Sequence, residues 1–125
     1  MKTIFLTLLF TLGLTLSHAQ PYPPVRDGSS EIEAKTDKIA DTYDAKLAMT
    51  AKQKVLFKLK VEDYLIKRQN IEEKYDGRDE LNALFNLQIQ ETADMNDILT
   101  RIQMQVYKKV KPEIQPLKII DTKTK

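Results

Sequence analysis

Apolar residues recur at the three- and four-residue spacing of amphipathic helices in four consecutive segments of this chain. These segments run from residue 30 to about 47, from 50 to about 75, from 79 to about 98 and from 100 to about 110. No segment shows a convincing strand signal. The pattern therefore predicts an all-α fold, a small four-helix, elongated and hairpin-like subunit.

Residues at the segment ends are typical helix starts and stops. Ser30 and Glu33 have the Ser-x-x-Glu spacing of a capping box, which predicts the start of the first helix. Asp76-Gly77 supplies a stop after the second helix, with a glycine suited to the left-handed cap position. Pro112 is expected to prevent the fourth helix from continuing.

The second segment differs from the others because its apolar residues form two stripes on a helical wheel. One stripe consists of Val55, Leu56, Leu59 and Ile66. The other consists of Phe57, Val61, Tyr64, Ile71 and Tyr75, with Leu65 at its margin. A helix with two apolar faces needs two partners. Both can be neighbours in its own bundle, or one face can meet a second subunit or a client protein.

The third segment is acidic and has a single apolar face. We expect that face to contain Leu81, Leu84, Phe85, Met95 and Ile98. Asp94 and Asp97 lie near the C-terminal end of the predicted helix, where the helix dipole disfavours negative charge. Their position predicts a basic partner nearby.

The N-terminal nineteen residues have the form of an export signal. Lys2 is followed by the uncharged apolar run 4–16, and Ser17-His18-Ala19 places small residues before a predicted cut after Ala19. The mature protein is then periplasmic or secreted; an uncleaved anchor is the alternative. We expect a Pro-rich, disordered lead-in over 20–29, a helical domain over 30–112 and a basic flexible tail over 113–125.

Composition excludes several kinds of chemistry. The chain has no Cys, and its one His, His18, lies in the predicted signal peptide. The mature chain therefore lacks imidazole bases, thiol nucleophiles and the usual zinc or copper ligands, so we expect no catalytic residues, no metal and no cofactor. Its acidic pairs are adjacent in sequence and point about 100° apart on a helix, which does not form a catalytic pair. The nearly neutral mature charge argues against nucleic-acid binding.

A short pattern occurs twice, fifty residues apart. An apolar residue is followed by Thr and, three residues later, by Gln; the two copies are Met49, Thr50 and Gln53, and Leu99, Thr100 and Gln103. This spacing predicts a reciprocal capping box at the start of the second and of the fourth helix. Loss of such a cap costs about 1 kcal/mol, which is reason enough for these residues, and direct binding by them is the minor interpretation.

The two motifs, the signal peptide and the helical mature chain together resemble the LTxxQ-motif envelope family of Spy/CpxP-like periplasmic proteins. The first copy departs from the family pattern because Met replaces Leu. The resemblance implies a four-helix, cradle-shaped, intertwined homodimer. It also implies action without ATP, by shielding partly unfolded envelope proteins or by binding a membrane sensor domain. The metal-sensing relatives depend on His or Cys ligands, so that branch is excluded.

The function predicted from the sequence is therefore that of a chaperone-like or stress-response binding protein, not an enzyme. The alternative is a non-enzymatic envelope adaptor or structural helical protein with one dedicated partner. The candidate partner-binding residues lie on the second helix and are Lys60, Tyr64, Lys67 and Arg68.

Overall fold

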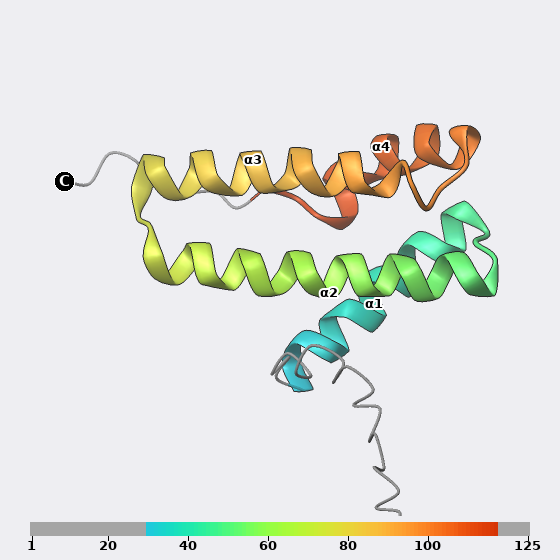
Figure 1. The fold of residues 1–125 in the computed structure, drawn as a ribbon, viewed down its shortest axis with the longest axis horizontal. Coiled ribbons are helices and arrows are strands. Elements are labelled where there is room, and N and C mark those ends of the chain that lie inside the picture. The colour runs from blue at the N-terminus through green and yellow to red at the C-terminus, as the bar shows by residue number, and fades with distance from the viewer. Residues whose placement is uncertain (1–29, 118–125) are drawn as a thin grey trace, which may run out of the picture.

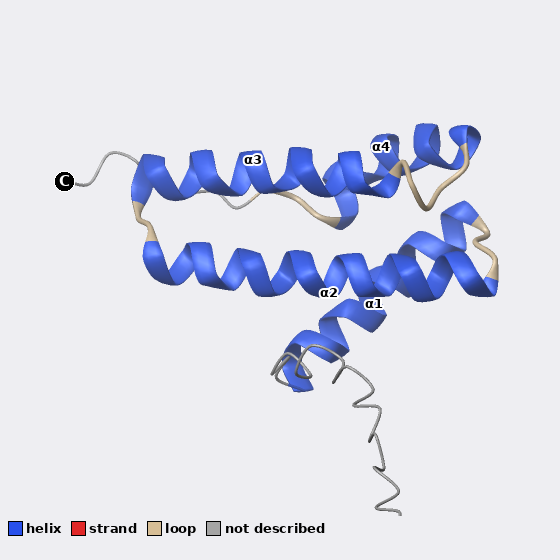
Figure 2. Cartoon of the chain, viewed as in Figure 1, coloured by secondary structure: helices blue, strands red, loops and turns tan. Residues whose placement is uncertain are grey.

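A computed structural model describes residues 30–117 and confirms the all-α fold, with four helices and no strand in that range (Figures 1 and 2). The helices are α1 (Ser30–Leu47), α2 (Ala51–Lys74), α3 (Gly77–Met95) and α4 (Arg101–Ile114). The predicted signal peptide, the Pro-rich lead-in and the last eight residues of the predicted tail lie outside the described residues.

The helices form an elongated hairpin with two shorter arms. α2 and α3 run antiparallel and are joined by a short turn at one end, and α2 extends beyond α3 at the other end (Figure 1). α1 crosses α2 obliquely, and α4 packs against α1. α2 is thus the central helix, with α1 and α3 as its direct neighbours.

Two helix boundaries near the turns differ slightly from the predictions. α1 already includes Ser30, so its cap position falls outside the described residues. α3 begins at Gly77, two residues before the predicted start near Asp79. Gly77 has the predicted left-handed φ, 55°, but it opens α3 and does not cap α2, whose C-cap is the extended residue Tyr75.

α3 ends at Met95, three residues before the predicted end. The backbone tightens there, because the Asn96 N–H donates to Ala93 O at 3.2 Å and the Leu99 N–H donates back to Met95 O at 2.9 Å. This turn brings the buried Leu99 into the core. A continued helix would carry Leu99 past that position.

The sequence predicted that the fourth helix stops before Pro112. That prediction is wrong, because α4 continues through Pro112 to Ile114. A proline removes only its own N–H, and in the last turn the loss is limited to one hydrogen bond. The Gln115 N–H still donates to Lys111 O at 2.7 Å. Residues 113–115, assigned by sequence to the flexible tail, therefore belong to the ordered domain, and Gln115 is buried.

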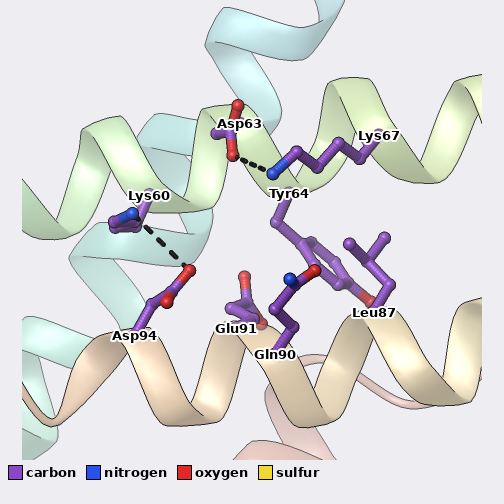
Figure 3. Close-up of a pocket in the computed structure, with 8 residues that line it drawn as sticks. All are labelled: Lys60, Asp63, Tyr64, Lys67, Leu87, Gln90, Glu91 and Asp94. Carbon is purple, nitrogen blue, oxygen red and sulfur yellow. Dashed lines mark ion pairs between the residues drawn. The ribbon is translucent and has the colours of Figure 1, made fainter.

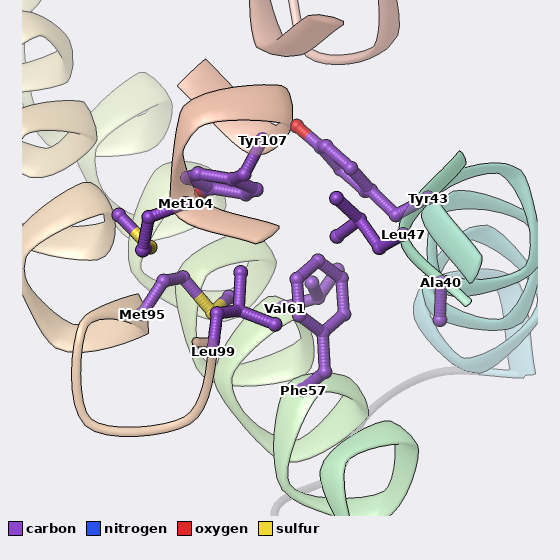
Figure 4. Close-up of a cluster of buried hydrophobic side chains, with 9 residues drawn as sticks. All are labelled: Ala40, Tyr43, Leu47, Phe57, Val61, Met95, Leu99, Met104 and Tyr107. Carbon is purple, nitrogen blue, oxygen red and sulfur yellow. The ribbon is translucent and has the colours of Figure 1, made fainter. Parts of the chain in front are cut away.

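The main core gathers side chains from all four helices and from the turn after α3 (Figure 4). At its centre three aromatic rings meet: the Tyr43 centroid lies 5.1 Å from those of Phe57 and Tyr107, which are 6.0 Å from each other. The cluster consists of Ala40, Tyr43, Leu47, Phe57, Val61, Met95, Leu99, Met104 and Tyr107. One predicted core residue of the third helix, Phe85, instead lies on the surface, and Leu87 is buried in its place.

The first prediction compares two apolar residues of α2 that lie two positions apart. Phe57 is fully buried, whereas Leu59 is 59% exposed. We expect Phe57→Ala to lower the free energy of unfolding by about 3–5 kcal/mol, because it opens a cavity in the core. Leu59→Ala serves as the control and is expected to change it by less than about 1 kcal/mol. Urea unfolding followed by circular dichroism measures both; similar losses would contradict the assignment of two distinct faces.

Candidate functional site

The two repeated motifs cap their helices as predicted. The Gln53 N–H donates to the Thr50 hydroxyl oxygen at 3.1 Å, and the Thr50 N–H donates to Gln53 Oε1 at 3.0 Å. At the start of α4 the corresponding distances for Thr100 and Gln103 are 3.3 and 2.9 Å. Both capping boxes are complete. Their apolar members, Met49 and Leu99, lie against or within the main core.

The structure adds a contact that capping alone does not explain, because the two motifs bind each other. Gln53 Nε2 donates to Gln103 Oε1 at 2.8 Å, and Gln103 Nε2 donates to Gln53 Oε1 at 3.1 Å. Each amide also donates to a carbonyl at the opposite corner, Gln53 to Ile98 O at 3.1 Å and Gln103 to Leu47 O at 3.2 Å. We call this reciprocal pair the glutamine clasp.

The glutamine clasp joins the corner between α1 and α2 to the corner between α3 and α4. Sequence analysis treated the two boxes as independent and missed it. The available signal was the repeat itself, since capping requires only Glu or Gln at the third position and both copies have Gln. A side-chain amide both donates and accepts, whereas an ionised carboxylate only accepts, so two Gln can pair where two Glu would repel.

At the other end of α4, a buried ion pair connects this helix to α3. Lys111 Nζ lies 2.7 Å from Glu91 Oε1, and the two residues are only 7% and 4% exposed. The ammonium also donates to the Tyr107 hydroxyl and to Thr92 Oγ1, both at 2.9 Å. Desolvation by burial raises the pKa of Glu91 above its usual value, and the nearby Lys111 partly opposes that shift.

Gln115 extends this network to α1. Its side-chain oxygen accepts a hydrogen bond from the Tyr43 hydroxyl at 2.7 Å, while its Nε2 lies 3.4 Å from Glu91 Oε2. Burial raises the pKa of Tyr43, so the phenol stays protonated and donates. Sequence analysis missed this network. A sequence signal for the burial of Glu91 was present, because Glu91 continues the helical spacing of Leu84 and Leu87 on the buried face of α3.

The four candidate partner-binding residues do not form one shared surface in the structure. Tyr64 is only 3% exposed, so it belongs to the interior and not to the surface. Lys67 pairs with Asp63 one turn earlier at 2.8 Å, and Lys60 Nζ lies 3.5 Å from Asp94 Oδ2 (Figure 3). The basic partner expected near Asp94 is thus Lys60.

Lys60, Tyr64 and Lys67 share one small pocket between α2 and α3 (Figure 3). Its volume of ≈ 10 Å³ admits about one water molecule and no larger ligand. Arg68 does not line it; its Nε donates to Glu72 at 2.9 Å beside the open groove between α1 and α2.

The second apolar stripe of α2 is open on the surface. Val55 is 60% exposed and Leu59 is 59% exposed, and Leu56 between them is also exposed. On the opposite side of the same helix, Phe57 and Val61 are fully buried. We call Val55, Leu56 and Leu59 the outer stripe. Phe57, Val61 and Tyr64 of one predicted stripe therefore pack internally, whereas Val55, Leu56 and Leu59 of the other are exposed. The prediction fails at two positions, because Tyr75 of the first stripe is 37% exposed and Ile66 of the second is half-buried.

Residues 30–117 contain no group of three or more acidic, His or Cys side chains placed to hold a metal ion. Among the helices described, none has the length and apolar character needed to cross a membrane. Within the described range, the features suited to binding are the outer stripe, the exposed Phe85 and Ile89 of α3, and the grooves between helices.

The fold and these surfaces define a small helical bundle with apolar side chains exposed on its outer helix faces. Comparison with protein-family models, with curated proteins and with solved structures gave no match for this chain.

The second prediction concerns the glutamine clasp. Gln53→Ala and Gln103→Ala each remove the side-chain half of one capping box and both hydrogen bonds between the two amides, so we expect each to lower the free energy of unfolding by about 1–2 kcal/mol. The double variant should lose less than the sum, because the clasp can be lost only once. A double-mutant cycle in urea should give a coupling energy of about 1 kcal/mol. Strict additivity would contradict a direct Gln–Gln interaction.

The third prediction is a pH dependence caused by Glu91. Because its pKa is raised in the folded protein, the folded state binds its proton more tightly than the unfolded state. The stability that Glu91 contributes is therefore present below its unfolded value of about 4.5, falls as pH rises to its folded pKa, and is constant above it.

Glu91→Gln removes this titration and leaves the other groups in place. The unfolding free energy of the natural protein minus that of the variant is expected to decrease between pH 4.5 and neutral pH. Urea unfolding of both proteins across this range measures the difference. A difference that increases with pH would show that Lys111 outweighs desolvation.

Proposed function

We propose that this protein is a non-enzymatic binding protein of the bacterial envelope, similar to the Spy/CpxP-like periplasmic proteins, that holds partly unfolded proteins or a sensor domain without ATP. The observation that carries the proposal is the outer stripe. Three adjacent apolar side chains are exposed on a helix whose opposite side forms the core. Exposed apolar patches of this kind are typical of interaction sites.

The character of the surface supports weak and adaptable binding. Charged residues such as Lys52 and Glu62 flank the outer stripe on the same helix. An exposed apolar surface with surrounding charges can contact many sequences in turn without a shaped pocket. The resemblance of the two motifs to the LTxxQ family and the predicted export signal support the envelope location.

A second copy of the chain is another partner for this face, and we propose the homodimer that the resemblance implies. In that arrangement, part of the outer stripe packs against the second subunit, and the cradle is formed between the two. The mass in solution tests this directly. A strict monomer at all concentrations would remove the dimeric cradle but would leave the outer stripe free for clients.

The fourth prediction tests client binding. The purified mature protein is expected to suppress the aggregation of an unrelated unfolded protein at near-stoichiometric ratio, as followed by light scattering. Leu59→Asp should reduce this protection severalfold, because it places a charge within the outer stripe. Asn70→Asp adds the same charge elsewhere on the exposed surface of α2 and is expected to leave protection unchanged.

Circular dichroism must show that both variants are folded. Absence of protection by the folded natural protein would count against a general client-binding role. If instead a single protein co-purifies and no aggregation is suppressed, the alternative of an adaptor with one dedicated partner is favoured.

A further inference from the structure

The two flanks of α1 carry opposite charges, and only the acidic flank forms ion pairs with a neighbouring helix. Its acidic flank faces α2, where Lys54 Nζ lies 2.8 Å from Asp41 and 3.5 Å from Asp44, and Lys58 pairs with Asp37. Lys54 also holds the pKa of the Asp41 carboxyl below its usual value. This flank is neutralised by its neighbour.

The basic flank of α1 faces α4 and is not neutralised in the same way. Lys38 and Lys46 make no ion pair with any residue between 30 and 117, whereas the nearby Lys35 is paired with Glu31 at 2.8 Å. The surface of α4 beside them contributes two aliphatic residues and one carboxylate, Glu113. A net positive charge therefore remains at this junction.

Between these two helices lies an open groove with an apolar floor. Ile39 of α1 and Val110 and Ile114 of α4 form the floor; each is partly buried and packs against the main core. Lys38, Lys46 and Glu113 stand around it, and the cavity measures ≈ 500 Å³. This volume lies within the range of about 300–1,000 Å³ found for binding pockets.

We infer that the groove between α1 and α4 binds an acidic amphipathic helix from another protein. The aliphatic floor requires apolar side chains on one face of the partner. Lys38 and Lys46 are eight residues apart on α1, which separates them by about 12 Å along the helix axis. Two carboxylates eight residues apart on a partner helix match this spacing, and helix-in-groove binding is a common mode of recognition.

Charge also argues against the nearest alternative occupant, the C-terminal end of this chain. That segment contains Ile119 and Ile120, but it also carries Lys118, Lys123 and Lys125 against a single acid, Asp121. A basic segment would add positive charge beside Lys38 and Lys46, whereas an acidic segment would neutralise them. The groove is separate from the outer stripe of α2, so this binding does not depend on the proposed client binding.

The experiment uses two synthetic peptides and the mature protein. Both peptides are sixteen residues long, labelled with fluorescein, and carry Leu at helical spacing on one face. One has Glu at two positions eight residues apart beside the Leu face, and the other has Lys at those positions. Fluorescence anisotropy is expected to show binding of the acidic peptide and much weaker binding of the basic one. Binding of the acidic peptide should weaken as salt rises, because the rim charges are exposed.

Variants of the rim make the test specific to this groove. The double variant Lys38→Glu with Lys46→Glu should weaken binding of the acidic peptide by about tenfold, since both attractions become repulsions. Glu113→Gln should instead strengthen it by about twofold, because it removes the only opposing charge of the rim. Lys108→Glu is the matched control, as it reverses an exposed charge of α4 beside a different surface, and should leave binding nearly unchanged.

Opposite effects at Lys38/Lys46 and Glu113 in folded proteins would support the groove as the binding site. The inference is overturned if neither peptide binds, if both bind equally, or if Lys108→Glu weakens binding as much as the rim variant does. Leu59→Asp should not alter peptide binding, so failure here is distinguishable from failure of the proposed chaperone-like function.

Discussion

The glutamine clasp is the contact on which the arrangement of the four helices depends. It joins the turn between α1 and α2 to the turn between α3 and α4 through two hydrogen bonds between the amides of Gln53 and Gln103. Two further bonds reach the carbonyls of Leu47 and Ile98. Because both amides also close their own capping boxes, the starts of α2 and α4 are fixed relative to each other. The aromatic rings of Phe57 and Tyr107, seven residues after each Thr, then meet in the core.

The far end of α4 is held by a different kind of interaction. The pair of Lys111 and Glu91 is buried, so the cost of desolvation offsets much of its attraction, and an apolar pair of the same shape could be equally stable. The contribution of this ion pair is to fix the position of α4 relative to α3. Lys111 must meet Glu91 and Thr92 of α3, and Gln115 must meet Tyr43 of α1, which fixes the position of α4 relative to both helices. The helix therefore continues through Pro112 until Gln115 is in place.

Local rules were sufficient for most of the fold. Capping at Thr50 and Thr100, the positive φ of Gly77 and the opposite placement of Phe57 and Leu59 on α2 all depend on nearby residues, and the structure confirms them. The failures involve contacts between distant residues. The sequence analysis predicted a helix end at Pro112 because local rules do not reveal the hydrogen bonds between Lys111 and distant residues such as Glu91. Tyr64 was taken as a contact residue because nothing in α2 alone shows which stripe faces inward. Lys67 lines the pocket between α2 and α3, whereas Arg68 lies beside the groove between α1 and α2. This difference likewise depends on where α1 and α3 pack.

The division of α2 into a core face and an outer stripe also explains how an apolar surface can be kept ready for binding. Phe57 and Val61 hold the helix against α1, α3 and α4, so Val55 and Leu59 are displayed on a backbone that is already ordered. Binding then costs less conformational entropy than it would for a flexible segment. The same separation means that residues of the outer stripe can change with little effect on stability, whereas changes at the core face cannot. Selection for partners and selection for folding can therefore act on opposite sides of one helix.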